Sequence, residues 1–157
     1  MNQQGKTIQT KNLTVGYQEG RNQFTPLIEN LNLSLPSASM TCLLGRNGIG
    51  KSTLIRTLAY LQPPINGEIW WGAQTPSSLS PRERATCVSI VLTGIENTGA
   101  LTVEEMVAIG RHPYTRWAGK LLEKDLEAID RALTQTGCDQ LRERVVQTLS
   151  DGERQRA

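Results

Sequence analysis

A glycine-rich segment, GRNGIGKS at residues 45–52, carries the residue types that a phosphate site needs. It fits the pattern G-x-x-x-x-G-K-[ST], with Gly45 and Gly50 at the fixed glycine positions. A triphosphate must be wrapped closely by backbone N–H groups, and side chains at Gly48 or Gly50 would hold it away. Lys51 is placed to reach the β- and γ-phosphates, and the Ser52 hydroxyl to bind Mg²⁺. The segment therefore predicts a site for a nucleoside triphosphate with magnesium.

The segments on either side match the strand and the helix that such a loop requires. Residues 40–44, MTCLL, form a short apolar run, which predicts a strand buried on both faces. The helix expected after the loop would add the positive end of its dipole and unpaired N–H donors to the phosphate site. The alternative is a glycine-rich turn with an exposed lysine. The helix is indicated by apolar residues at helical spacing, namely Leu54, Ile55, Leu58 and Leu61.

The rest of the N-terminal part predicts β-structure. TIQTKNLTV and IENLNLSLP, within residues 7–35, indicate two antiparallel strands joined by the polar loop QEGRNQ. GEIWWG and CVSIVL predict two further strands, separated by a Ser/Pro-rich loop, TPSSLSPRER. We therefore expect a first domain at residues 1–93 that contains strands and the phosphate loop.

Beyond residue 93 the pattern changes to helices, which predicts a helical domain at residues 94–157. Thr102 and Glu105 form a capping box, and Gly110 is well placed to end that helix. A longer helix is expected at about 120–136, with Gly137 ending it. Its expected apolar stripe consists of Leu122, Leu126, Ile129 and Leu133. On its surface, Glu127 is expected to form an ion pair with Arg131.

Composition and charge exclude several classes of protein. The chain has 157 residues, is 38% hydrophobic and carries a net charge of +2, with both signs interspersed. This describes a globular protein and offers no electrostatic case for a nucleic-acid partner. The N-terminus lacks the apolar core of a signal peptide, and 18 consecutive apolar residues occur nowhere, so we expect a cytoplasmic chain. Cys42, Cys87 and Cys138 form no CxxC pair and are expected to be reduced, mostly buried thiols.

The last residues, LSDGERQRA, contain a second capping box, formed by Ser150 and Glu153. A helix should therefore begin at Ser150. A helix start that carries Ser150 and Gly152 is also a candidate anion site, although the motif alone supports only the helix.

GRNGIGKST followed about a hundred residues later by LSDGERQR resembles the ATPase subunit of an ABC transporter. The resemblance covers nearly the whole chain and implies an α/β fold: a P-loop NTPase core with an antiparallel β N-terminal part and an inserted helical subdomain. It implies that Tyr17 stacks on adenine and that the signature residues Ser150 and Gly152 complete the ATP site of the opposite subunit in a dimer. By the same resemblance Asn47 and Thr53 join the phosphate-loop residues in binding ATP.

The segment TVEEMVAIGRHPYTRWAG resembles importers of iron-siderophore complexes, haem and cobalamin. The resemblance thus implies an ATP-binding subunit of such an importer, which works with Mg²⁺, forms a homodimer and docks on membrane permease subunits at the inner face of the membrane. His112 lies in this segment and is expected at the surface, away from the family's catalytic histidine.

The sequence departs from the family pattern at three positions, one of which is Glu153, where a glutamine is usual. Thr93 stands where a glutamine usually contacts the metal, so Thr93 and Ser52 are the candidate metal ligands. Asp151 stands where a glycine is usual, and we expect its side chain to point away from nucleotide and favour the helix start.

No catalytic residue is identified, because the family's Walker B glutamate and switch histidine would follow the signature helix, after Ala157. We therefore expect these 157 residues to be incompetent for hydrolysis alone, with the C-terminal part of the domain absent and the fragment poorly soluble or partly unfolded. Alternatives are a catalytically inactive nucleotide-binding fragment, a soluble ABC ATPase of repair or translation, and, ranked last, a small P-loop GTPase or nucleotide kinase.

Overall fold

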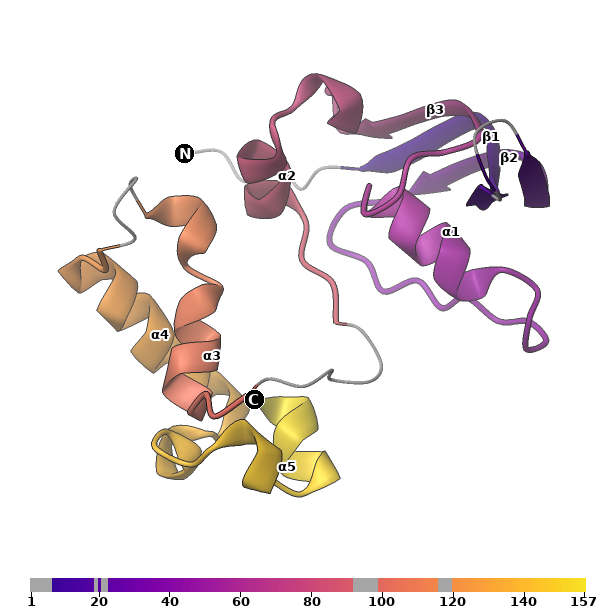
Figure 1. The fold of residues 1–157 in the computed structure, drawn as a ribbon. Helices are drawn as coiled ribbons and strands as arrows, with labels where there is room; N and C mark the ends of the chain where they lie inside the picture. Colours follow the sequence, from indigo (N-terminus) through magenta and orange to yellow (C-terminus); the bar gives the residue numbers. More distant parts are fainter. Residues whose placement is uncertain (1–6, 19, 21–22, 92–98, 116–119) are drawn as a thin grey trace. The chain divides into compact units, whose positions relative to one another are not determined.

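The computed structural model describes residues 7–18, 20, 23–91, 99–115 and 120–157 (Figure 1). The chain divides into two compact units, Met1–Ile90 and Val91–Ala157. The first contains a sheet and two α-helices, and the second is helical. The boundary expected at residue 93 lies outside the described residues.

A three-stranded antiparallel sheet forms the centre of the first unit. Strands β1 (Ile8–Gln18), β2 (Phe24–Leu35) and β3 (Asn66–Trp71) are arranged in the order β2-β1-β3. The predicted hairpin and the strand in GEIWWG are thereby confirmed. The sheet packs on helix α1 (Lys51–Leu58), whose Leu58 carbonyl accepts a hydrogen bond from the Trp71 indole at 3.0 Å. The buried residues of this core are Leu13, Val15, Leu54, Ile69 and Trp71.

Two predicted strands are absent from the structure. Residues 40–44 have no regular structure, and Met40 and Leu44 are about nine-tenths exposed. Residues 88–91 likewise form no strand. A buried strand needs neighbours that accept and donate its backbone hydrogen bonds, and the only sheet in the described residues is β2-β1-β3. The burial that these apolar runs predicted is therefore wrong as well, because the runs carry no information on the strands required beside them.

A helix occupies part of the segment that was expected to be a loop. Helix α2 (Pro81–Cys87) begins with Ser80 as its N-cap and with Pro81 at the first helical position. Ser80 and Glu83 form a capping box, with the Ser80 N–H donating to the Glu83 carboxylate at 2.8 Å. The sequence signal, S-P-R-E, was present in TPSSLSPRER and was missed because the segment is rich in serine and proline.

The second unit is built on helices α3 (Val103–Ile109), α4 (Glu123–Thr136) and α5 (Asp151–Arg156). The predicted capping box of α3 is confirmed, and α4 ends as predicted at Gly137, which has a φ of 65°. The unit's buried core consists of Val103, Ile129, Leu133, Cys138, Val146 and Leu149. Short 3₁₀ turns lie at Pro76–Ser78 in the first unit and at His112–Tyr114, Asp139–Leu141 and Val146–Thr148 in the second.

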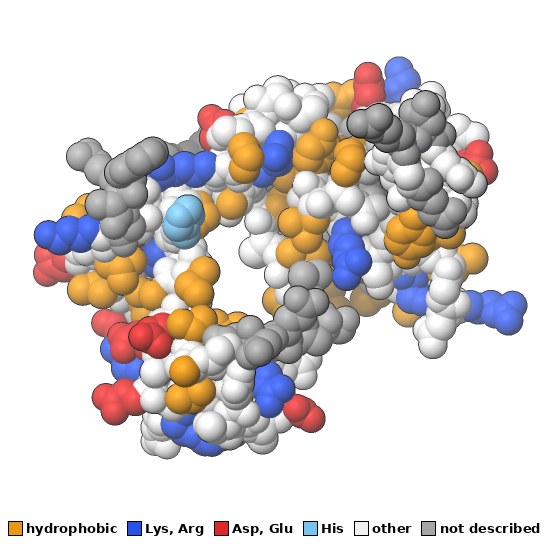
Figure 2. Space-filling model, in the orientation of Figure 1, with side chains coloured by type: hydrophobic (Ala, Val, Ile, Leu, Met, Phe, Trp, Pro, Cys, Tyr) orange, Lys and Arg blue, Asp and Glu red, His pale blue; other side chains and the backbone are white. Residues whose placement is uncertain are grey.

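The predicted apolar stripe of α4 is only half right. Ile129 and Leu133 are buried, but Leu122 and Leu126 are about half exposed, and hydrophobic side chains reach the surface in both units (Figure 2). Asp125 is buried in their place. Its carboxylate accepts hydrogen bonds from the Arg111 guanidinium at 2.9 and 3.1 Å and from the Leu122 N–H at 3.1 Å. A paired carboxylate can be buried where a pattern of hydrophobicity predicts a leucine.

The three cysteines and the histidine differ in exposure. Cys138 is buried and Cys87 half-buried, but Cys42 is exposed, so the prediction of burial was wrong for Cys42. His112 is exposed as expected. Within the described ranges, every helix is too short or too polar to cross a membrane.

The paired Asp125 generates a prediction on stability. Asp125→Asn removes the charge facing Arg111 and should lower the melting temperature by at least about 5 °C, because it leaves a partly buried cation unpaired. The matched control is Glu127→Gln on the same helix, whose ion pair with Arg131 spans 3.5 Å at the surface and should contribute almost nothing. Thermal unfolding followed by circular dichroism measures both.

The pH dependence of this difference has a defined sign. The Leu122 N–H, and then Arg111, hold the pKa of Asp125 below its ordinary value. A carboxyl whose pKa is lower in the folded state stabilises the fold above its ordinary pKa, near 4, and loses that contribution as the pH falls through the folded pKa. The gap between wild type and Asp125→Asn should therefore shrink only below about pH 4; a gap that vanished already at pH 6 would contradict the assignment.

Candidate functional site

The glycine-rich loop leads directly into α1, and its conformation depends on two glycines. Gly48 and Gly50 have φ values of 83° and 100°, in the left-handed region that side chains disfavour. A Cβ at Gly50 would also lie 3.2 Å from the Leu27 side chain, whereas one at Gly48 would meet open space. Gly48 is therefore required for its backbone angle, and Gly50 for both its angle and its close packing on β2.

Lys51, the first residue of α1, folds back over this loop. Its ammonium donates hydrogen bonds to the carbonyls of Gly45, at 2.7 Å, and Arg46, at 2.8 Å. The positive charge is thus held close to the loop by two backbone carbonyls. An anion bound in the loop would meet this charge without a large movement of the side chain.

The N-terminus of α1 is left open, unlike those of the other described α-helices. Its N-cap is Gly50, which offers no side-chain acceptor, and its first turn contains no acidic residue. Helices α2 to α5 each have a carboxylate in the first turn that accepts a hydrogen bond from the N-cap backbone. The first N–H groups of α1 have no partner within the helix, and the helix dipole favours negative charge there. This end of α1 suits an anion.

The other predicted residues of the first unit lie around this helix start. Ser52 and Asn47 are exposed, so their side chains are accessible to a ligand. Thr53 is buried, and its hydroxyl donates a hydrogen bond to the Tyr17 oxygen at 2.9 Å. Tyr17 is 51% exposed and borders a hollow of about 160 Å³ together with Phe24 and Gln62. The structure thus brings Tyr17 to the phosphate loop from a strand that is distant in sequence.

Ser150 is the N-cap of α5, as predicted. Its N–H and hydroxyl both donate to the Glu153 carboxylate at 2.8 Å, and its hydroxyl oxygen accepts from the Glu153 N–H at 3.3 Å. The Ser150 N–H, and then its hydroxyl, hold the pKa of Glu153 below its ordinary value. Glu153 is therefore ionised at neutral pH.

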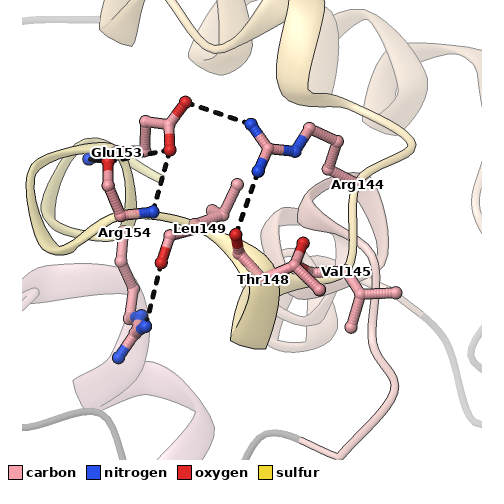
Figure 3. A network of polar contacts seen from close by, with 7 residues as sticks. Arg144, Val145, Thr148, Leu149, Glu153 and Arg154 are labelled. Carbon is pink, nitrogen blue, oxygen red and sulfur yellow. Dashed lines mark hydrogen bonds and ion pairs between the residues drawn. The ribbon is translucent and has the colours of Figure 1, made fainter.

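Arg144 completes this network, and sequence reasoning missed it. Its guanidinium donates to the Glu153 carboxylate at 3.1 Å and to the Thr148 carbonyl at 2.9 Å (Figure 3). It thereby balances the charge of Glu153 and joins the segment before Ser150 to the first turn of α5. A single arginine six residues before Ser150 has no recognisable spacing, because the turn that brings it back to Glu153 cannot be deduced from periodicity.

The remaining two residues of this helix start point outward. The Asp151 side chain is fully exposed, 3.9 Å from the Arg154 guanidinium. Gly152 is exposed, has open space where a Cβ would lie, and has no positive φ. The chain's own fold therefore does not require glycine at this position.

The predicted site residues fall into separate units. Ser150 and Gly152 lie in Val91–Ala157, and the predicted residues from Tyr17 to Thr53 lie in Met1–Ile90. Thr93, the predicted second metal ligand, is outside the described residues. No group of three or more His, Cys, Asp or Glu side chains that could hold a metal occurs in the described part of the chain.

The loop glycines generate a prediction on folding. Gly50→Ala should destabilise the protein by about 1–3 kcal/mol, since it combines backbone strain with contact on Leu27. Gly48→Ala introduces the backbone strain without the contact on Leu27, so it should lower the free energy of unfolding by less. The control Gly152→Ala removes a glycine from an exposed helix and should be neutral or stabilising. Urea unfolding of the three variants measures the order, and equal losses at positions 50 and 152 would refute it.

The comparisons with known proteins identify the family of this chain. The family model described as ABC transporter matches residues 28–157, so the chain belongs to the ABC transporter ATP-binding family. The petrobactin import ATP-binding protein FpuD of Bacillus anthracis is 40% identical over 97% of this chain, and the ferric enterobactin transport ATP-binding protein FepC of Escherichia coli is 36% identical over 96%. The chain spans about half the length of these relatives, 54% of each.

Solved structures share the fold. A metal-chelate type ABC transporter in an inward-facing conformation matches with a TM-score of 0.74 and 26% identity, over 96% of this chain and 53% of that one. A dimeric ATP-binding cassette in a post-hydrolysis state, bound to ADP and Pi, matches with a TM-score of 0.79 and 22% identity, over 95% and 66%. The expected fold class, an ABC ATPase core with an antiparallel β part and a helical part, is thereby confirmed.

Proposed function

We propose that this chain forms the N-terminal part of the ATP-binding subunit of an ABC importer, which couples binding and hydrolysis of MgATP to uptake of an iron complex, haem or cobalamin. The observation that carries the proposal is the open N-terminus of α1, with Lys51 held over the loop. The substrate class is supported by the relatives, whose names describe import of petrobactin and ferric enterobactin.

The residues of the first unit have separate roles in this proposal. The N–H groups at the start of α1 bind the phosphates, and Lys51 exchanges its carbonyl partners for β- and γ-phosphate oxygens. Tyr17 offers its exposed ring to adenine. Asn47 lies within the loop, and Thr53 lies in the first turn of α1. Ser52 holds Mg²⁺, with Thr93 as the proposed second ligand; the ion neutralises phosphate charge when bound.

The second unit serves a partner's nucleotide. We infer a dimer of ATPase subunits, in which Ser150 and Gly152 approach the ATP of the opposite subunit, and a matched cassette is described as dimeric. Glycine at position 152 costs helix stability, and close approach of a ligand accounts for it better than the fold does. The partners would further include integral membrane permease subunits, which would place the protein at the inner face of the membrane.

Hydrolysis needs more than the residues assigned above. The first turn of α1 is free of acidic residues, so this turn supplies no carboxylate as a base for water. We therefore propose that residues 1–157 alone bind MgATP without turning it over. The residue that would polarise the attacking water belongs to the part of the family domain that follows the signature helix.

Lys51 provides the first test of the proposal. Lys51→Ala should weaken binding of a fluorescent ATP analogue about 10- to 100-fold, because it removes charge-assisted hydrogen bonds to phosphate. The matched control is Lys11→Ala, an exposed lysine on β1, which should leave the affinity unchanged. Fluorescence titration in the presence of Mg²⁺ measures both variants. Equal affinity of wild type and Lys51→Ala would overturn the proposal.

A further inference from the structure

Tyr17 and Thr53 are joined by a hydrogen bond whose two ends differ greatly in exposure. The Thr53 hydroxyl donates to the Tyr17 phenol oxygen at 2.9 Å. Thr53 is 3% exposed, whereas Tyr17 is 51% exposed. The bond thus ties the tip of an accessible aromatic ring to the buried face of the first turn of α1.

The backbone beneath Tyr17 is held independently of that bond. Tyr17 is paired with Thr25 in the ladder between β1 and β2. The neighbouring Gly16 packs so tightly that a Cβ there would lie 2.1 Å from the Thr25 carbonyl oxygen, and the Gln62 amide donates to the Gly16 carbonyl at 3.2 Å. With the backbone fixed, the main freedom left to Tyr17 is rotation of its side chain, and the hydrogen bond from Thr53 restrains that rotation.

Thr53 is well suited to act as the fixed end of this bond. It is β-branched and buried within α1, which restricts its side chain to few rotamers. Its carbonyl accepts from the Thr57 hydroxyl at 2.8 Å, one turn further along the helix. It also stands two residues after Lys51, so the same helical turn carries the phosphate-facing lysine and the anchor for the ring.

We propose that Thr53 is a positioning residue for the nucleobase: its hydroxyl holds the Tyr17 ring in the orientation that receives the base. This inference rests on the proposed function, and it adds a specific link between the two ends of the site. The start of α1, which binds the phosphates, would then also fix the orientation of the Tyr17 ring on which the base stacks. The ligand class that benefits is a nucleoside triphosphate, and a triphosphate without a base gains nothing.

The experiment compares binding of ATP with binding of inorganic tripolyphosphate, both with Mg²⁺, by isothermal titration calorimetry. Thr53→Val, which keeps the shape but lacks the hydroxyl, should weaken ATP binding about fivefold and leave tripolyphosphate binding within about twofold. Tyr17→Phe deletes the same bond from the exposed side and should show the same pattern. The double variant should be no weaker than either single variant. Thr53→Ser keeps the hydroxyl and should restore most of the ATP affinity.

Each other outcome overturns the inference. Equal losses for ATP and tripolyphosphate in Thr53→Val would show that Thr53 acts on phosphate directly. Additive losses in the double variant, or unchanged ATP binding in both single variants, would show that the bond positions nothing. Should Thr53→Val fail to fold by circular dichroism, Tyr17→Phe decides alone.

Failure of the proposed function gives a different result. In that case wild type binds neither ligand, and the positioning role falls with it. Wild type that binds both ligands equally tightly retains the phosphate site of Lys51 but overturns the role of Tyr17 and Thr53 toward a base.

Discussion

The structure of the first unit depends on one constraint, the uncapped start of α1. Gly50 takes a left-handed conformation with a φ of 100°, offers no side-chain acceptor and packs closely on β2, where a Cβ would lie 3.2 Å from the Leu27 side chain. The chain can therefore enter α1 only by a tight turn that leaves its first N–H groups without intrahelical partners. Such groups are costly when they lack a partner, and here the Lys51 ammonium stands over the same loop. An anion in the loop would pair with these N–H groups and with the Lys51 charge at the same time.

The N-terminus of helix α5 also has unpaired backbone N–H groups to satisfy, but it uses side chains of its own chain to do so. Its start is capped by Ser150, and the Glu153 carboxylate accepts from both the N–H and the hydroxyl of that serine. A carboxylate at this position is favoured by the helix dipole but would repel a phosphate at close range. Arg144 offsets that repulsion by pairing with Glu153 at 3.1 Å. The two helix starts thus share a preference for negative charge, but α1 must obtain it from outside the chain, whereas α5 contains its own.

Local patterns predicted the features that local interactions determine. The capping boxes of α3 and α5 and the loop glycines depend on residues a few positions apart, and the hairpin of β1 and β2 depends on two strand-like segments joined by a short polar loop. Residues 40–44 were wrongly predicted as a strand because strand formation requires partners that no local pattern reveals. Asp125 and Arg144 show that local patterns also fail to reveal the partners of polar residues. Each is explained only by a partner, Arg111 or Glu153, that the fold brings to it.

The contrast between the helix starts implies an order of events within the proposed function. Nucleotide binding at α1 costs little reorganisation, because its N–H groups are unpaired and Lys51 has only to exchange carbonyl partners. Ser150 can serve a phosphate only by giving up or sharing its two bonds to Glu153, each 2.8 Å long. Such an exchange is favourable only when a strong anion already stands opposite, fixed by another helix. The loop at α1 would therefore load first, and the serine would respond to a nucleotide that is already bound.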